Sequence, residues 1–295
     1  MEKIAIIGSD GQLGTDLMSA CRERGVPVIG LTRDDIEVTD ARSTEAALSA
    51  SLPGIVINTA ACQGASTYTT ADQSIFFDVN ALGVWNVARW CGQHGCTLVH
   101  YSTDYVFGGD AARQLPYTEE DLPFPVNAYG NSKVAGEYFV RAYCPQHYVV
   151  RVASLYGSAG CLAKNRSNFV KMVLGKAARG EVLEVVADQV MSPTWSAMAA
   201  AKTLDLVDSP CDWGIYHMAG SGSCSWYEFA IEIVRVMGAN VEVRPVTTAV
   251  EGPDSIFLRP RYTPLDNAKI RRAGLDNLPP WQEALASFVR KEMKE

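Results

Sequence analysis

Short apolar runs alternate with amphipathic stretches through the first half of the chain, and this alternation constrains the fold more than any other feature. Five runs have the composition of strands: Ile4–Ile7, Val26–Leu31, Ile55–Asn58, Thr97–Ser102 and Tyr148–Val152. Helical patterns begin between them, near Leu13, Ser43, Asp72 and Tyr129. Strands that are apolar on both faces and separated by helices are typical of a parallel sheet covered on both sides. The right-handed crossover rule then predicts a doubly wound, Rossmann-type α/β fold.

The pattern changes after about residue 155. Residues at helical spacing then occupy Asn168–Ala178, Ser196–Val207, Trp226–Met237 and Trp281–Lys291. We therefore expect two units, residues 1–155 and residues 156–295, the second smaller and mostly helical. Two strand-like pieces of the second unit, Val182–Val186 and Ile215–Met218, are candidates to return to the main sheet.

Composition narrows the classes of partner. The chain has 295 residues, 47% hydrophobic and 20% charged, which is typical of a globular protein and excludes collagen, coiled coil and disorder. Its 26 Lys and Arg against 33 Asp and Glu give a net charge of −7, which argues against a nucleic-acid partner. The N-terminal apolar run is too short for a signal peptide, and none reaches the roughly 18 residues of a membrane helix. We therefore expect a cytoplasmic protein.

Cysteine and histidine show no metal-binding pattern. The eight cysteines contain no C-x-x-C pair, and the four histidines have no ligand spacing. We expect free thiols in a reducing compartment and no metal site.

The segment Gly8–Gly14 directly follows the first predicted strand and opens a helical pattern. Glycines at Gly8, Gly11 and Gly14 permit a tight turn and let backbone N–H groups approach a pyrophosphate at the positive end of the helix. A plain strand-to-helix turn is the alternative. The order of strand, glycine loop and helix favours a dinucleotide site, so the first unit is predicted to bind NAD(P) and the second mainly the substrate.

Arg33 stands just after the second predicted strand. An acidic residue at this position would bind a ribose 2′-hydroxyl, whereas a guanidinium suits a 2′-phosphate. The position favours NADPH over NADH, although NADH and a purely solvated role for Arg33 beside Asp34 and Asp35 stay open.

A second motif combines a strand end with a helix start. Thr103 ends the fourth strand pattern, and Tyr129 and Lys133 lie four residues apart, which places them on one face of the next helix. An ammonium beside a phenol lowers the phenol's pKa, so we expect Tyr129 to donate a proton to a carbonyl oxygen, with Thr103 orienting that oxygen. Surface neighbours at the same spacing are the alternative for an isolated Y-x-x-x-K pattern.

These motifs resemble a known family. The G-x-x-G-x-x-G loop is similar to that of extended short-chain dehydrogenases/reductases. The chain more specifically resembles the dTDP-4-dehydrorhamnose reductase family, from the glycine loop nearly to the C-terminus. The pieces that carry this resemblance are Gly11–Gly14, Val56–Ala61, Asn80, Tyr101–Phe107, Tyr129–Lys133, Ser192–Thr194, Arg259–Pro260 and Leu265–Lys269. Such enzymes transfer a hydride from a nicotinamide cofactor to the 4-keto group of a nucleotide-linked deoxysugar, so the resemblance implies reduction of dTDP-4-dehydrorhamnose to dTDP-L-rhamnose.

The resemblance also implies site residues. The catalytic residues would be Thr103, Tyr129 and Lys133. The cofactor site would contain Gly8, Gly11, Gln12, Leu13, Arg33, Asp40, Ala60, Ala61, Asn80, Ser102 and Lys133, with Asp40 near the adenine. The substrate site would contain Thr103, Tyr105, Tyr129, Asn168, Trp226 and Arg259. Core packing is the alternative for Trp226, and a plain surface position is the alternative for Arg259.

Some residues of the chain also bear on related reactions and functions. Sugar-nucleotide 4,6-dehydratases need an Asp-Glu pair after the threonine, but here Asp104 precedes Tyr105, so the base for elimination is missing. The chain departs from the family pattern after Ala61 and after Arg151. Two alternatives therefore stay open: a non-catalytic NADP-binding subunit resembling the regulator of methionine adenosyltransferase, and a reductase of another carbonyl compound. The sugar nucleotide, the stereochemistry and a homodimeric state are left open.

Overall fold

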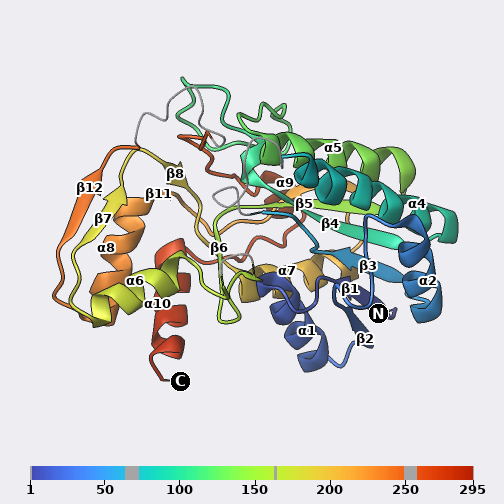
Figure 1. The fold of residues 1–295 in the computed structure, drawn as a ribbon, viewed down its shortest axis with the longest axis horizontal. Helices are drawn as coiled ribbons and strands as arrows, with labels where there is room; N and C mark the ends of the chain where they lie inside the picture. Colours follow the sequence, from blue (N-terminus) through green and yellow to red (C-terminus); the bar gives the residue numbers. More distant parts are fainter. Residues whose placement is uncertain (1, 64–72, 163–164, 249–257, 295) are drawn as a thin grey trace.

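A six-stranded parallel sheet forms the centre of the molecule in a computed structural model that describes residues 2–63, 73–162, 165–248 and 258–294 (Figure 1). The strand order is β10-β5-β4-β3-β1-β2. The strands are β1 (Ile4–Ile7), β2 (Val28–Leu31), β3 (Ile55–Asn58), β4 (Thr97–Thr103), β5 (His147–Val152) and β10 (Gly214–His217). The predicted doubly wound α/β fold is confirmed. From β1 the chain adds β2 on one side of the sheet and β3, β4 and β5 on the other, so the strand order reverses between β1 and β3. Doubly wound folds bind ligands at the carboxyl ends of the strands at such a point.

Helices cover both faces of the sheet, and β1 shows why its sequence is apolar throughout. Ile4 and Ile6 pack in one cluster with Leu17 of α1 (Gln12–Glu23), while Ala5 and Ile7 pack in another with residues of the opposite helices. The first face is covered by α1 and α7 (Ser196–Asp208), the second by α2 (Ala41–Ser51), α4 (Val84–His94) and α5 (Ala128–Tyr143) (Figure 1). Alternate residues of each central strand are therefore buried on opposite sides.

A second cluster of elements packs around its own aromatic core. Its helices are α6 (Phe169–Ala178), α8 (Trp226–Met237) and α10 (Trp281–Glu292), and Phe229 and Phe288 are buried between them. Strands β7 (Leu183–Val186) and β12 (Val243–Val246) form a separate parallel pair beside them (Figure 1). Short pairs join β6 (Leu155–Tyr156) to β9 (Thr194–Trp195) and β8 (Val190–Met191) to β11 (Cys224–Ser225).

The two strand-like pieces of the second region have different fates. The prediction that Val182–Val186 returns to the main sheet is wrong, because β7 pairs with β12; Glu184 is exposed, whereas the central strands are largely buried on both faces. The piece Ile215–Met218 does contribute to the main sheet, since β10 pairs with β5 at its edge. The division into residues 1–155 and 156–295 stays a prediction.

One helix of the first half has an irregular course. The helical pattern predicted from Asp72 begins outside the described residues; the described part is α3 (Ser74–Phe77), followed without a break by the π-helical turn η3 (Asp78–Gly83) and by α4. A short α9 (Ala268–Arg272) lies beside β10. Among the described residues, none of the helices has both the length and the apolar character required to span a bilayer.

Candidate active site

The glycine loop packs so closely on α1 that only glycine fits at Gly14. A Cβ atom there would lie 2.1 Å from the carbonyl oxygen of Gly8. The helix begins at Gln12 and Leu13, and Gly11 in front of it provides no side-chain cap; the first turn also contains no acidic residue. The first N–H groups of α1 are therefore free of a capping side chain, which is the arrangement that binds phosphate oxygens.

Arg33 and Asp40 lie in the loop that follows β2. The Arg33 side chain is 86% exposed and its guanidinium is 3.4 Å from Glu37, so it is free to meet an anionic ligand. Asp40 differs from the expectation of an adenine contact. Its carboxylate accepts a hydrogen bond from the backbone N–H of Arg42 at 2.8 Å and caps α2. Its position in the chain satisfied the family pattern, but its side chain stabilises a helix.

Asn80 is fully buried in η3 and holds the chain that follows β3. Its side-chain oxygen accepts from the N–H of Cys62 at 2.8 Å, and its amide nitrogen donates to the Cys62 carbonyl and to Ser132, both at 3.0 Å. Both amide protons are used, so the side chain positions Cys62 and, through it, the neighbouring Ala60 and Ala61. The place of Asn80 in the lining of the cofactor site stays a prediction.

Ser102 likewise directs its side chain to another residue. Its hydroxyl donates to the Glu137 carboxylate at 2.6 Å, and that carboxylate also receives two hydrogen bonds from Arg151. All three side chains are buried. The hydroxyl proton is therefore unavailable to a cofactor, and a direct contact from Ser102 would have to come from its backbone.

Thr103 and Tyr129 meet at the carboxyl end of β4. A hydrogen bond with Thr103 acts on the Tyr129 phenol, and the Thr103 hydroxyl also lies 3.1 Å from a carboxylate oxygen of Asp104. The Tyr129 ring packs edge-on against Tyr105 with centroids 5.9 Å apart, and against Phe76 at 6.2 Å. Two of the three predicted catalytic groups are thus directly in contact.

Lys133 is only 2% exposed and lies one turn along α5 from Tyr129. Its ammonium donates to the backbone carbonyl of Tyr101 at 2.6 Å and lies 3.5 Å from Nε2 of His100. The overall pKa of Tyr129 differs from the expectation of a lowered value, because it is raised. Burial raises that pKa above its usual value, the hydrogen bond with Thr103 opposes the increase, and the charge of Asp104 adds to it.

Asp104 is a candidate site residue that the sequence motifs did not single out. Its carboxyl group is 3% exposed and accepts hydrogen bonds from Thr103 at 3.1 Å and from Thr263 at 2.6 Å. Burial raises its pKa to about 6, against the effect of these hydrogen bonds. Its position directly after Thr103 was visible in the sequence. Its contact with Thr263 was not, because the two residues are 159 positions apart.

The predicted substrate residues divide into two groups. A hydrogen bond joins Tyr105 to Arg259, and Tyr105 in turn packs on Tyr129, so these residues form one cluster. Asn168 instead caps α6, and its amide donates to Gln12 at 3.0 Å, which links the second region to the glycine loop.

Trp226 packs on Phe169 with ring centroids 4.6 Å apart, in agreement with the core-packing alternative. The structure also shows a contact that the sequence did not indicate. The side-chain amide of Gln63, after β3, donates to the Cys161 sulfur at 3.4 Å, and Cys161 is one of the groups that raise the pKa of Tyr129. All eight thiols are free.

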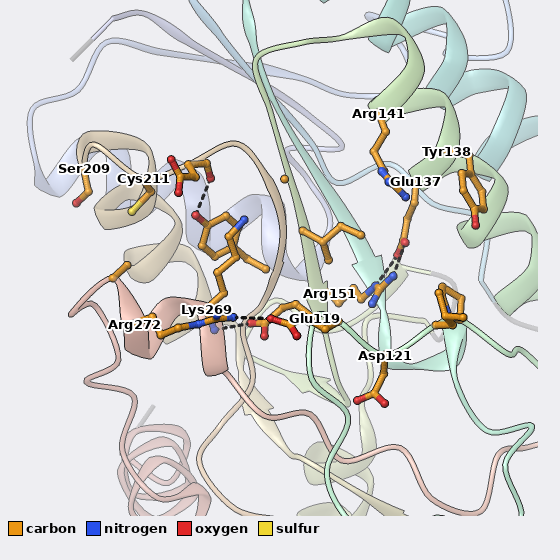
Figure 2. Close-up of a pocket in the computed structure, with 18 of the residues that line it drawn as sticks. Glu119, Asp121, Glu137, Tyr138, Arg141, Arg151, Ser209, Cys211, Lys269 and Arg272 are labelled. Atoms are coloured by element: carbon orange, nitrogen blue, oxygen red, sulfur yellow. Dashed lines mark hydrogen bonds and ion pairs between the residues drawn. The ribbon is translucent and has the colours of Figure 1, made fainter.

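A cavity of about 830 Å³ lies elsewhere, beside the edge strand β10 (Figure 2). Figure 2 shows Glu137 of α5 and Arg151 of β5 directed at one another, with Lys269 and Glu119 farther along the cavity. Within the described residues, its lining does not include the catalytic candidates, which instead lie at the end of β4. The cavity and the candidate active site are therefore separate. Glu137 connects them, because it lines the cavity and accepts a hydrogen bond from Ser102, next to Thr103.

Comparison with known proteins agrees with this geometry. A family model described as the RmlD substrate binding domain matches residues 1–294. The chain belongs to this family. Relatives of the RmlD family include the spore coat polysaccharide biosynthesis protein SpsK of Bacillus subtilis, which is 34% identical over 99% of this chain and 98% of its own. A dTDP-4-dehydrorhamnose reductase of Streptomyces griseus is 33% identical over 95% of this chain and 90% of its own.

Solved structures give the same result. The dTDP-4-dehydrorhamnose reductase of Bacillus anthracis, solved in complex with NADP, has a TM-score of 0.89 and 33% identity, covering 98% of this chain and 99% of its own. A dTDP-4-dehydrorhamnose reductase of Clostridium acetobutylicum has a TM-score of 0.88 and 34% identity, covering 99% of both chains. The predicted resemblance to the dTDP-4-dehydrorhamnose reductase family is confirmed.

Proposed function

We propose that the chain is an NADPH-preferring reductase of the 4-keto group of a nucleotide-diphosphate deoxysugar, with dTDP-4-dehydrorhamnose as the candidate substrate. The observation that carries this proposal is the contact of the Tyr129 phenol with Thr103 at the carboxyl end of β4. The names of the relatives support it, because reductases of this sugar nucleotide and of dTDP-4-keto-6-deoxy-D-glucose are among them.

The residues at the glycine loop fit a dinucleotide. The close packing at Gly14 and the uncapped start of α1 would hold the pyrophosphate, and the exposed Arg33 would meet a 2′-phosphate. When bound, a reduced nicotinamide supplies the hydride that reaches the carbonyl carbon. The same loop is held from the second region by Asn168 through Gln12.

Tyr129 would supply the proton to the carbonyl oxygen. The phenol is protonated at neutral pH, as a proton donor must be, although its raised pKa makes it a weaker acid than a free tyrosine. Thr103 would hold the same oxygen by a hydrogen bond after its hydroxyl proton turns from Asp104 to the carbonyl. Lys133, held by the Tyr101 carbonyl, would place a positive charge at the base of the site.

Tyr105 and Arg259 would bind the substrate. Their hydrogen bond places an exposed guanidinium beside the ring that packs on Tyr129. A guanidinium is suited to two parallel hydrogen bonds with a diphosphate. The substrate would therefore extend from Tyr129 towards Arg259.

Oxidation of NADPH by the purified protein in the presence of dTDP-4-dehydrorhamnose tests the proposal. Tyr129→Phe should reduce turnover by roughly 10²- to 10⁴-fold while retaining NADPH binding, since only the proton donor is lost. Tyr138→Phe, an exposed tyrosine on the same helix, is the matched control and should retain turnover. Equal turnover in wild type and Tyr129→Phe would contradict the catalytic assignment. NADPH binding with no turnover in either protein would instead favour the non-catalytic regulatory alternative.

We further propose a cytoplasmic location and a homodimer. Tyr138, Tyr143 and Leu82 leave exposed apolar surface on α5 and η3, which supports a self-contact there. Light scattering of the purified protein and fractionation of cells test these two points.

A further inference from the structure

Lys133 and Glu137 are two buried, oppositely charged residues on one face of α5. They are four positions apart, 2% and 3% exposed, and so lie one helical turn from each other. The Lys133 ammonium is otherwise held by the carbonyl of Tyr101 at 2.6 Å and approached by His100 at 3.5 Å. Neither of these two groups brings a negative charge.

The Glu137 carboxylate is fixed from two strands of the sheet. Ser102 of β4 donates to Oε1 at 2.6 Å. Arg151 of β5 donates through Nε to Oε1 at 2.9 Å and through Nη2 to Oε2 at 2.7 Å (Figure 2). Arg151 is 1% exposed. A carboxylate with three charge-assisted or hydroxyl hydrogen bonds and no exposure has little freedom to move.

The electrostatics of Lys133 depend on this carboxylate. Burial lowers the pKa of Lys133 to about 8, and the charge of Glu137 is the cause that acts in the opposite direction. His100 does not help, because burial, followed by the charge of Lys133, holds its own pKa well below the usual value and keeps it neutral. The groups that face Lys133 from β4 and α5 are thus a carbonyl, a neutral imidazole and one anion.

We propose that Glu137 is a positioning residue of the active site: it keeps the Lys133 ammonium charged, while Ser102 and Arg151 hold its carboxylate in place. The catalytic meaning of this assignment rests on the function proposed above. The electrostatic part can be measured without turnover, so the two can fail separately.

Direct titration of Lys133 tests the electrostatic part. Lysine side chains labelled with ¹³C at Cε are followed by NMR against pH in the full-length protein, and Lys133→Arg assigns the Lys133 signal. In Glu137→Gln the midpoint for Lys133 should move to a pH lower by about 1, since an opposite charge nearby has been removed. Glu120→Gln is the matched control, because Glu120 lines the same cavity but its side chain is 77% exposed; it should leave the midpoint unchanged.

A double variant separates charge from structural support. Glu137→Gln leaves Arg151 buried without its anion, which can destabilise the fold, whereas Glu137→Gln with Arg151→Met removes both charges. If Glu137 acts on Lys133 by its charge, the single variant lowers the midpoint, and loss of the Arg151 charge in the double variant raises it part of the way back. A midpoint that does not move in the single variant, or that falls further in the double variant, overturns the proposal.

The pH profile of reduction provides the catalytic readout. In wild type, kcat should fall as the pH rises through about 8, where Lys133 loses its proton. In Glu137→Gln this fall should begin at a pH lower by about 1, and Glu137→Asp should restore part of the difference. A purely structural role would lower kcat equally at every pH, which would contradict the proposal. A shifted NMR midpoint in a protein without turnover would instead remove the proposed function alone.

Discussion

The Asn80 side chain makes two hydrogen bonds with the backbone of Cys62: its oxygen accepts from the Cys62 N–H, and its nitrogen donates to the Cys62 carbonyl. The side chain thereby ties the π-helical turn η3 to the segment that leaves β3, where Ala60 and Ala61 lie. A π-helical turn at this place is consistent with the frequent occurrence of such turns at functional sites. A buried asparagine can in this way support the predicted cofactor site by holding the backbone beside Ala60 and Ala61.

Asn80→Ala should therefore lower both stability and cofactor affinity. Three hydrogen bonds are lost, and with about 1 kcal/mol for each the free energy of unfolding should fall by about 2–3 kcal/mol. Urea unfolding and NADPH titration measure the two effects. Asn86→Ala, which removes a single hydrogen bond to the Val38 carbonyl, should cost only about 1 kcal/mol. Similar losses in both variants would contradict the assigned role of Asn80.

Gly14→Ala should weaken binding of NADPH. The added Cβ would meet the Gly8 carbonyl at 2.1 Å, so α1 must move away from the loop. We expect the Kd to rise by roughly tenfold or more and stability to fall by about 1–3 kcal/mol. Gly175→Ala in α6 is the control: its Cβ meets only the flexible Arg179 side chain at 3.5 Å, and it should stabilise the protein by about 0.5–1 kcal/mol. Unaltered NADPH binding by Gly14→Ala would show that the glycine loop and the start of α1 do not hold the pyrophosphate.

Asp104 should make stability depend on pH. Its folded-state pKa of about 6 exceeds the ordinary value near 4, so the folded protein holds the proton more tightly than the unfolded chain does. The stabilising contribution is complete below about pH 4 and is lost as the pH rises through about 6; two pKa units correspond to about 3 kcal/mol. Asp104→Asn removes this dependence. Urea unfolding at several pH values should show wild type losing stability relative to the variant from pH 4 to pH 7, and parallel curves would refute the effect.

Arg33→Ala should change the choice of cofactor. Removal of the exposed guanidinium should weaken NADPH binding by roughly 10- to 100-fold and leave NADH binding nearly unchanged, because only NADPH has the 2′-phosphate. Fluorescence titration with both cofactors measures this selectivity. Arg42→Ala, an exposed arginine on α2, should affect neither cofactor. An equal loss of affinity for NADPH and NADH would show that Arg33 does not bind the 2′-phosphate.

The central strands were predictable because burial on both faces leaves an unbroken apolar run, as in Ile4–Ile7, which is β1 without change of boundary. The π-helical turn at Asp78–Gly83 was not, since its residues carry no pattern that differs from an α-helix. Residue spacing placed Tyr129 and Lys133 on one helix face. It could not show that the ammonium would be bound by the carbonyl of Tyr101, because that contact depends on how α5 packs on β4.

Hydrogen bonds made within the protein account for the other differences, some to distant residues and some to near ones. Ser102 fits the cofactor pattern locally, but its hydroxyl is taken by a carboxylate 35 positions later. Asp40 fits the pattern of the loop, but the helix that it caps begins at the next residue. Local motifs therefore located the site correctly as a neighbourhood, while packing between distant segments decided which atoms are available.

Tyr129, Lys133 and Glu137 all project from α5, whose Gly136 lies so close to the Asn80 carbonyl that a Cβ there would approach it to 2.3 Å. The proton donor, the cation and the anion thus lie on one helix, which packs tightly against η3. A disturbance of the surrounding layers moves these groups in concert and preserves their mutual spacing. A substitution elsewhere that shifts α5 would therefore move all three groups together, relative both to the ligand and to the strand residues that act on their protonation.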